Sequence, residues 1–326
     1  HKEFITTLLE YRQISKSVAT FVEGILKRVA RDGRVHMDFI VHGTQTGRLS
    51  CSNPNVQNIP ILMGKEIRQG FIVPEGWSFI AADYSQLENR VGAFYSGDKN
   101  LTEIFKSGRD IHRETAAKIF RKPAKDITFT ERYISKFATH GISYSRGAKS
   151  MMEGAEMDYY VDELHGKRWT LEEAQAVVDA FWAAYPEYKI WVDKTKAFAI
   201  DHGYVKTFSG RRRRFPMLSR ENRSGVERQA GNSPIQGGGS DLCLSALIRL
   251  HERLDPERAY ILFTVHDSIE VEARDDYLEE ALQIMKYEME TNLPIKSEVP
   301  FKVDITYGKM WEDENEKQYS GAGKGH

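Results

Sequence analysis

The chain has 326 residues, with 46 lysines and arginines against 47 aspartates and glutamates, so its formal net charge is −1. This balance excludes a protein that is basic overall, and any binding to nucleic acid must come from local patches of positive charge. Hydrophobic residues make up 40% of the chain, which is typical of a soluble protein of two or three lobes, and no apolar stretch approaches the roughly 20 residues of a membrane span.

The first half of the chain predicts a helix, two strands and then further helices. Apolar residues at helical spacing predict a helix over residues 2–30, and RVHMDFIVH predicts a strand before a polar loop at 44–60. The apolar run WSFIAADYS at 77–85 predicts a buried strand that leads into a helix. Residues 99–200 are expected to be mostly helical.

The second half returns to strands. They are expected within residues 203–216, and a helix is predicted from Ser240 to Arg253, after three glycines at 237–239 that we interpret as flexible backbone rather than a phosphate loop. AYILFTVHDSIEVEA predicts a hairpin, ALQIMKYEME a helix and PFKVDITYG a final strand, and the last seven residues predict a flexible tail. Helices between two sheet-forming regions predict an α+β fold with an all-α insertion.

Two aspartates stand at the ends of predicted strands. Asp83 ends the apolar strand in AADYSQLENR, and Asp267 lies at the bend of FTVHDSIEVE, where an ordinary solvated turn is the alternative. The two could meet across one sheet, where like charges repel unless a divalent cation lies between them. Oxygen ligands suit Mg²⁺, and two such ions about 4 Å apart can stabilise the attacking and leaving oxygens of a phosphoryl transfer.

A stripe of polar side chains follows one face of the predicted helix ERYISKFATHGISY. Its members recur every four residues: Arg132, Lys136, His140 and Tyr144. Because four residues turn a helix by about 400°, these side chains stay close to one line. Cations bind phosphates and a ring stacks on a base, although a solvated cationic face has the same pattern. The arginines at 211–214 are likewise either a solvated patch or a contact with a nucleic-acid backbone.

Five motifs follow one another between about residue 5 and residue 312: TGRLSCSNPNVQNIP, AADYSQLE, R-x₃-K-x₇-Y, NSPIQGGGSD and VHDS. In this order they resemble the polymerase domain of family A DNA polymerases, the DNA polymerase I type. The resemblance implies an α+β right-hand fold, with an antiparallel palm sheet, an all-α fingers insertion and most of the thumb absent. The domains it implies are a thumb-to-palm helix at 1–34, palm at 35–97 and 203–312, fingers at 98–202 and a C-terminal tail at 313–326.

The resemblance also implies an activity, template-directed DNA synthesis, in which the primer 3′-OH attacks the α-phosphate of a dNTP and pyrophosphate leaves. Asp83 and Asp267, with the Tyr84 carbonyl, would hold two Mg²⁺ ions, and Lys136 would be the candidate acid for the leaving group. Fingers closure would carry the cationic helix onto the nucleotide. The residues implied at the dNTP are Arg132, Lys136, His112, His140, Glu88, Tyr144 and Gln86. Those implied at the primer–template DNA are Arg48, Asn55, Gln57, Arg228, Asn232, Gln236 and His266.

Two of these residues have more specific implied roles. Glu88 would crowd the sugar and reject ribonucleotides, where a helix-surface glutamate is the alternative. Tyr144 would stack beside the template base. The amides and arginines at the duplex suit minor-groove acceptors, which are similar on all base pairs, so contacts there sense pairing geometry rather than sequence.

The chain departs from the family pattern at several places. Residues 266–268 read His-Asp-Ser where the family usually has His-Asp-Glu, which predicts an active site with altered metal dependence. His140 replaces the usual Phe or Tyr, and residues 152–169 predict an extra fingers element. The missing thumb leads to the hypothesis of a split polymerase, with a separate N-terminal chain or fragment that carries thumb and exonuclease.

Two other functions fit parts of the pattern. A single-subunit RNA polymerase shares the two aspartates and the Arg/Lys helix, but Glu88 argues against room for a ribonucleotide. A non-catalytic DNA-binding replication subunit would not need both aspartates together with Arg132 and Lys136. Cys51 and Cys243 lie far apart in sequence, which favours a reduced cytoplasmic compartment, in a bacterial cell or phage-infected host. No membrane partner is expected.

Overall fold

The computed structural model describes residues 2–143, 145–156 and 169–320, and the chain divides into two units. Unit 1 comprises the described residues of His1–Ser85, Ser240–Pro294 and Phe301–His326. Unit 2 comprises the described residues of Gln86–Gly239 and Ile295–Pro300. No helix of the described chain is both long enough and apolar enough to cross a membrane.

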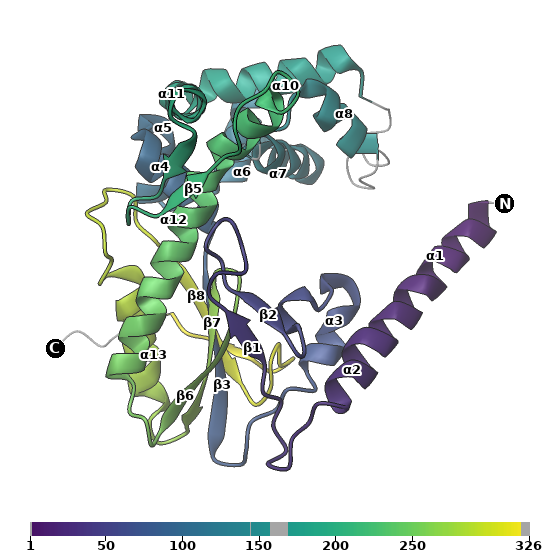
Figure 1. Ribbon diagram of the computed structural model, residues 1–326, viewed down its shortest axis with the longest axis vertical. Coiled ribbons are helices and arrows are strands. Elements are labelled where there is room, and N and C mark those ends of the chain that lie inside the picture. The colour runs from purple at the N-terminus through teal and green to yellow at the C-terminus, as the bar shows by residue number, and fades with distance from the viewer. Residues whose placement is uncertain (1, 144, 157–168, 321–326) are drawn as a thin grey trace. The chain divides into compact units, whose positions relative to one another are not determined.

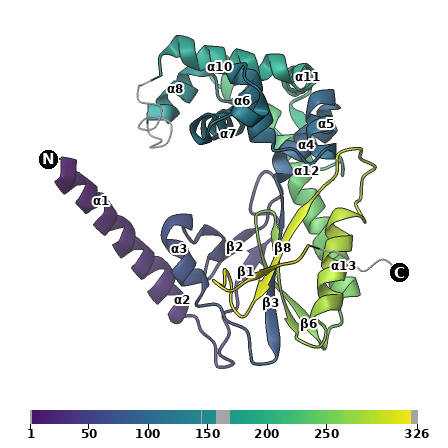
Figure 2. The same cartoon turned by 180° about the vertical axis from the view of Figure 1, so that it is seen from behind.

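Unit 1 is built, over its described residues, on a five-stranded antiparallel sheet with the strand order β6-β7-β3-β8-β9 (Figure 1). The predicted strand at 77–85 is confirmed as β3, the middle strand, and the predicted hairpin is confirmed as β6 and β7. Helix α13 lies along one face of the sheet, against β3, β7 and β8 (Figure 2). The elements are β3 (Trp77–Tyr84), β6 (Ala259–Val265), β7 (Ser268–Arg274), β8 (Val303–Gly308), β9 (Lys317–Gln318) and α13 (Leu278–Glu290).

The two faces of β3 have different roles. Ile80 and Ala82 are fully buried on the side of α13, and the hydroxyl of Tyr84 donates to the carbonyl oxygen of Met289 on that helix at 2.9 Å. Because side chains alternate along a strand, Phe79 and Asp83 point to the opposite face. Phe79 there joins a core cluster, so Asp83 follows directly on the packed part of the strand. The other buried members of this cluster are Phe21, Ile25, Cys51, Val56, Ile59, Phe263 and Trp311.

The N-terminal part of unit 1 covers this second face. The helix predicted over 2–30 is confirmed as far as Leu26, as three consecutive helical segments, and the predicted strand RVHMDFIVH is reduced to three residues. A long polar loop joins the two short strands, which pair antiparallel. The elements are α1 (Lys2–Ser17), η1 (Val18–Val22), α2 (Glu23–Leu26), β1 (Asp38–Ile40), β2 (Ser50–Ser52), η2 (Val56–Asn58) and α3 (Ile61–Arg68).

Unit 2 is mostly helical, as predicted for residues 99–200. Several helices begin at side chains that satisfy free backbone N–H groups: Asp98 accepts from the N–H of Leu101 at 3.0 Å, and Thr170 forms a capping box with Glu173. The helices are α4 (Leu87–Ser96), α5 (Lys99–Lys106), α6 (Ile111–Phe120), η3 (Ala124–Asp126), α7 (Phe129–Ser143), α8 (Ala148–Glu156), α10 (Leu171–Ala184) and α11 (Pro186–His202). The short strands are β4 (Tyr204–Lys206) and β5 (Arg212–Arg214). Most of the extra element expected at 152–169 lies outside the described residues.

One prediction about a helix start is wrong. The helix predicted from Ser240 begins at Arg223, so α12 (Arg223–Arg253) runs through Pro234 and the three glycines. Two of them, Gly238 and Gly239, allow close packing of α12 on α4. A Cβ atom on Gly238 would lie 3.0 Å from the hydroxyl oxygen of Tyr95, and one on Gly239 would lie 3.1 Å from Cδ2 of Leu87. The glycines therefore provide close contact between helices instead of flexible backbone.

Candidate active site

The turn between β6 and β7 presents His266 and Asp267. Val265 pairs with Ser268, so only these two residues form the turn. His266 has φ 58°, a left-handed backbone conformation that residues with a side chain adopt at a cost of about 1–2 kcal/mol. A two-residue hairpin turn commonly needs such a conformation, and strain of this kind is frequent at functional sites.

Asp83 lies beside this turn in the sheet of unit 1. It pairs in register with Ser268 on β7 and with Asp304 on β8. The N–H of Tyr84 donates to the carbonyl oxygen of Asp267 at 3.3 Å, which ties the end of β3 to the turn. The structure thus brings together the two aspartates that the sequence places 184 residues apart.

The local charge around Asp83 is strongly negative. Its side chain is reached by solvent, but protein atoms surround most of it, and this loss of water is the main reason that its pKa rises to about 7. The charges of Asp267 and Asp304 raise the pKa further. Burial and the charges of Asp267, Glu270 and Asp83 also raise the pKa of the Cys243 thiol. Several acidic groups therefore share one small region.

This region suits a hard divalent cation. Asp83 and Asp267 offer carboxylate oxygens, and one buried carboxylate oxygen of the neighbouring Glu270 has no hydrogen-bond partner. Within the described residues, no group of three or more acidic, histidine or cysteine side chains is arranged to hold a metal ion, so the candidate ligands are this pair. A pair of carboxylates suits Mg²⁺ when the ion also keeps waters and substrate phosphates.

Three of the predicted DNA-binding residues lie in unit 1 near the turn. Gln57 donates from Nε2 to the carbonyl oxygen of Thr264, two residues before His266, at 3.0 Å. Asn55 begins η2, and its buried Oδ1 has no hydrogen-bond partner, so it can accept a bond from a bound molecule. Arg48 lies earlier in the chain, in the polar loop between β1 and β2, where its carbonyl oxygen accepts a hydrogen bond from the hydroxyl of Thr44 at 2.7 Å.

In unit 2, the polar stripe predicted on one helix lies on α7. Lys136 and His140 are exposed, and Arg132 is half-buried. Arg132 donates from Nε to Oδ2 of Asp110 at 2.5 Å, and Asp110 also caps α6 by accepting from two backbone N–H groups. Burial opposes ionisation of Asp110, but the hydrogen bond from Arg132 and its charge outweigh it and lower the pKa. Tyr144 lies outside the described residues.

His112 supports this stripe from the first turn of α6. It is only 5% exposed, and its ring centre lies 5.8 Å from that of His140. Burial, followed by the charge on His140, lowers the pKa of His112 to about 4, so the ring is neutral at neutral pH. Burial and Lys136 lower the pKa of His140, whereas Glu88 acts in the opposite direction. The residue Gln86, with φ 55°, directly precedes α4, and Glu88 lies in the first turn of that helix.

The other three predicted DNA-binding residues recur every four positions on α12 within unit 2. Arg228 is exposed and donates from Nη1 to the hydroxyl of Ser224 at 2.7 Å. Asn232 has a buried Oδ1 without a hydrogen-bond partner, as Asn55 has in unit 1. Gln236 is half-buried one turn further on. Their common face can therefore offer amide and guanidinium groups to a ligand.

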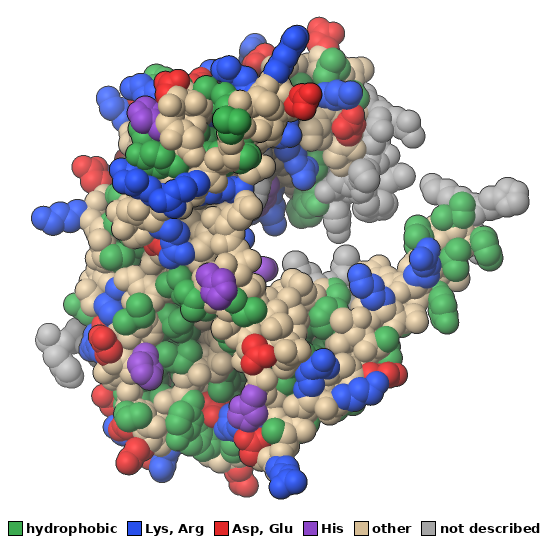
Figure 3. Space-filling model, in the orientation of Figure 1, with side chains coloured by type: hydrophobic (Ala, Val, Ile, Leu, Met, Phe, Trp, Pro, Cys, Tyr) green, Lys and Arg blue, Asp and Glu red, His purple; other side chains and the backbone are tan. Residues whose placement is uncertain are grey.

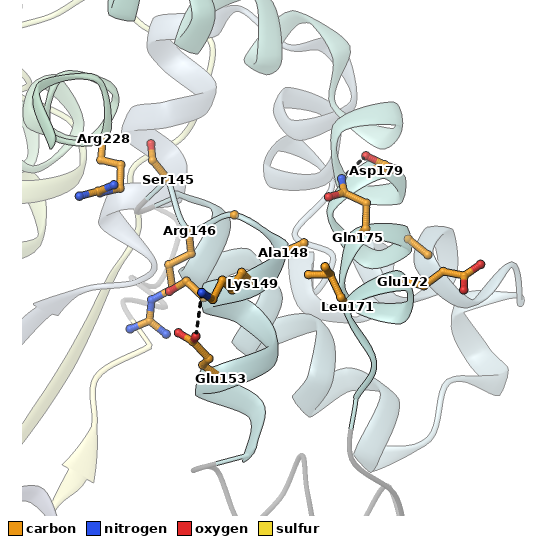
Figure 4. Close-up of a pocket in the computed structure, with 13 residues that line it drawn as sticks. Ser145, Arg146, Ala148, Lys149, Glu153, Leu171, Glu172, Gln175, Asp179 and Arg228 are labelled. Carbon is orange, nitrogen blue, oxygen red and sulfur yellow. Dashed lines mark hydrogen bonds and ion pairs between the residues drawn. The ribbon is translucent and has the colours of Figure 1, made fainter. Parts of the chain in front are cut away.

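Arg228 also lines a cleft of about 1410 Å³ in unit 2, together with residues of α8, α10 and the loop after α7 (Figure 4). Lys149 faces Glu153 with 4.0 Å between Nζ and Oε1, and Gln175 donates to Asp179 at 2.8 Å (Figure 4). Positive and negative groups share this lining, so charge alone selects no ligand for it.

The arginine run at 211–214 forms β5 and the residue before it. Figure 3 shows lysine and arginine side chains gathered over the region of β4 and β5. Arg213 donates to the hydroxyl of Ser233 on α12 at 2.7 Å, and Arg212 lies over the ring of Tyr204 at 4.8 Å. These two arginines thus hold the hairpin in place, and the choice between a solvated patch and a DNA contact stays open for the run as a whole.

Comparison with known proteins decides the family. The model of DNA polymerase family A matches residues 1–313. The chain belongs to this family. The thermostable DNA polymerase I of Thermus filiformis is 37% identical over 313 residues, which cover 94% of this chain and 36% of that protein. DNA polymerase I of Geobacillus stearothermophilus is 38% identical over 322 residues, which cover 96% of this chain and 35% of that protein.

A solved structure confirms the fold of this member of the family. The POL domain of Pol1 from M. smegmatis, in complex with DNA primer–template and dNTP, matches with a TM-score of 0.84 and 32% identity, over 95% of this chain and 53% of that one. The predicted α+β polymerase fold is therefore correct. The chain spans about a third of the length of the curated relatives that it matches. Polymerases of this family depend on metal ions.

Sequence reasoning missed three side chains of the two sites. Asp304 belongs to β8, and no local sequence pattern predicts that this strand pairs with β3. Glu270 follows Ser268 at the strand period of two, a signal that could have placed it on the same face as Asp83. Asp110 stands directly before a predicted helix, a typical capping position, but its pairing with Arg132 depends on how α6 and α7 pack.

Proposed function

We propose that the chain catalyses template-directed DNA synthesis, adding dNMP to a primer 3′-OH with release of pyrophosphate. The observation that carries this proposal is the pair Asp83 and Asp267, held beside each other where β3 ends next to the β6–β7 turn, in an excess of negative charge. The family favours this activity over that of a single-subunit RNA polymerase. The carboxylate pair speaks against a non-catalytic DNA-binding subunit.

We propose that Asp83, Asp267 and the carbonyl oxygen of Tyr84 hold two Mg²⁺ ions. When bound, such ions activate the attacking oxygen and neutralise charge on the phosphates and the leaving group. The part of the protein is to fix the two carboxylates. The buried ring of Tyr84 anchors the strand through Met289, and the N–H of Tyr84 holds the turn through Asp267.

In unit 2, Arg132 and Lys136 would bind the triphosphate, and Lys136 would donate a proton to the departing pyrophosphate. Asp110 holds the guanidinium of Arg132 in one orientation, which reduces the entropy lost on phosphate binding. The neutral His112 ring packs against His140 and supports it at the nucleotide. Gln86, Glu88 and Tyr144 complete the proposed dNTP site, with Glu88 against the sugar and Tyr144 as the stacking residue.

The proposed duplex-binding residues divide between the units. Arg48, Asn55, Gln57 and His266 belong to unit 1, and Arg228, Asn232 and Gln236 belong to unit 2. Amide and guanidinium donors suit the acceptors that every base pair presents in the minor groove, so these contacts would sense correct pairing in any sequence. The palm and fingers boundaries, the separate N-terminal partner and the cytoplasmic location stay predictions.

Primer extension tests the proposal. The chain is incubated with a primer–template, Mg²⁺ and either dNTPs or rNTPs, and compared with Asp267→Asn and with Asp276→Asn, an exposed aspartate in the turn that follows β7. We expect extension with dNTPs, a loss of at least about 10²-fold in Asp267→Asn and no change in Asp276→Asn. Equal extension by wild type and Asp267→Asn contradicts the assigned site. Preference for rNTPs contradicts the polymerase type, and tight DNA binding without extension favours the non-catalytic alternative.

A further inference from the structure

A carboxylate besides that of Asp304 lies on the same face of the sheet as Asp83. Glu270 follows Ser268 by two residues on β7, and the register pairs Asp83 with Ser268 and Ala81 with Glu270. Residues that pair across two strands share a face, and so do alternate residues along one strand. The side chains of Asp83, Ser268 and Glu270 therefore all point to one side. The sheet therefore places Glu270 next to the two aspartates that we assign to the metal ions.

The surroundings of Glu270 leave its charge unbalanced. The residue is 2% exposed, and its Oε1 lies 2.6 Å from the hydroxyl oxygen of Ser268. Its Oε2 is buried without a hydrogen-bond partner, and within the described chain no basic side chain forms an ion pair with it. Burial, together with the charges of Asp83 and Asp267, raises the pKa of Glu270 to about 8.

The next glutamate on the same face shows what an ordinary buried carboxylate requires. Glu272 is also 2% exposed, but Oε1 of Glu272 lies 2.6 Å from Nη2 of Arg34. A buried carboxylate without such a cation is costly and is retained where it serves a function. Glu270 instead leaves Oε2 without a hydrogen-bond partner, and it interacts electrostatically with both proposed metal ligands.

The hydroxyl of Ser268 connects Glu270 to the turn that carries Asp267. Its oxygen lies 2.6 Å from Oε1 of Glu270 and 3.0 Å from the carbonyl oxygen of Val265, at the last residue before the turn. A hydroxyl has one proton and cannot donate to both oxygens fully at once. The position of the turn is therefore linked to the charge state of Glu270.

We propose that Glu270 is a positioning residue of the metal centre, a third carboxylate whose negative charge strengthens divalent-cation binding at Asp83 and Asp267 and whose link to the turn runs through Ser268. This inference rests on the proposed function. It also accounts for the sequence His-Asp-Ser, because the carboxylate that is absent at position 268 stands two residues further along the same face.

The test measures metal affinity without DNA or turnover. Mn²⁺ is titrated into the chain, and free Mn²⁺ is followed by electron paramagnetic resonance, for wild type, Glu270→Gln and the matched control Glu272→Gln. The titration is done at pH 8.5, above the raised pKa of Glu270, so Glu270→Gln keeps the side-chain shape and removes the charge, and we expect about tenfold weaker binding. Glu272→Gln removes the charge paired with Arg34, and we expect a lower melting temperature but Mn²⁺ affinity within about twofold of wild type.

A transposed carboxylate separates a metal-linked role from a purely structural one. Glu270→Val combined with Ser268→Glu returns a carboxylate to the site at another position, and we expect it to bind Mn²⁺ more tightly than Glu270→Val alone. Wild-type affinity in Glu270→Gln overturns the inference, as does equal affinity in the double and single variants. Asp267→Asn identifies the site: if it leaves Mn²⁺ binding unchanged, the metal site of the proposed function is itself wrong. If it abolishes binding while Glu270→Gln does not alter it, only the role of Glu270 fails.

Discussion

The buried charge of Glu270 predicts an unusual dependence of stability on pH in the absence of metal ions. The perturbation is Glu270→Gln, which removes the ionisable group and keeps its volume. In the folded protein the pKa of Glu270 is raised from its ordinary 4.5 to about 8, mainly by burial. Between these two values the folded chain holds a proton that the unfolded chain has released. The free energy of unfolding therefore falls as pH rises through this window.

The raised pKa sets the size of the effect. One pKa unit corresponds to about 1.4 kcal/mol, so the wild type should lose up to about 5 kcal/mol of stability between pH 4.5 and pH 8 through this residue alone. Glu270→Gln should lose much less over the same range, with a remaining slope from Asp83, whose pKa is also raised. At pH 8 the variant should be the more stable protein.

Urea denaturation in EDTA at pH 5, 6, 7 and 8 measures these free energies, and hydrogen exchange of the β3 and β7 amides reports the opening of unit 1 itself. Mg²⁺ should raise the stability of the wild type most at pH 8, where the acidic groups carry the most negative charge. The same pH slope in wild type and Glu270→Gln would refute the reasoning, because it would show that Glu270 carries no unbalanced charge in the folded chain.

Three further predictions concern packing and positioning. Glu288 is fully buried and pairs with two arginines of α12, so Glu288→Ala should destabilise the protein by about 3–5 kcal/mol in urea denaturation; a change under 1 kcal/mol would contradict a buried ion-pair network. Gly238→Ala should lower the free energy of unfolding by about 1–3 kcal/mol, because the new Cβ atom would lie 3.0 Å from Tyr95 on α4. Gly225→Ala is the control on the same helix: a Cβ there has nothing within 4 Å, so the change should stabilise the protein by about 0.5–1 kcal/mol. Effects of equal sign would disprove the close-packing role. Asp110→Asn keeps a helix cap but weakens its hold on Arg132, so the KM for dNTP should rise about three- to tenfold with a smaller change in kcat, and an unchanged KM would exclude the positioning role.

The sequence alone predicted the elements that carry the two aspartates. An apolar strand that ends in Asp83 and an apolar hairpin with Asp267 at its bend are local patterns, and the alternation of side chains makes such patterns reliable. The stripe on α7 was likewise predictable as far as His140, because helical periodicity alone places Arg132, Lys136 and His140 on one face.

Local patterns gave a wrong prediction for the backbone at the three glycines before Ser240. Glycine signals a turn or flexible backbone when only neighbours in sequence are considered. In the structure Gly238 and Gly239 lie inside α12, because the side chains of Val91, Tyr95 and Leu87 on α4 occupy the space that larger residues would need. Packing against a helix far away in sequence overrode the local preference.

The sequence by itself indicated the family and most of the elements, including those that carry Asp83 and Asp267, since each of these depends on residues close together in the chain. Only the tertiary structure decided which charges those aspartates face. Strand order places Asp304 opposite Asp83, and strand register places Glu270 behind it. Electrostatic energy depends on distance in space and on burial, and neither can be read from separations along the chain.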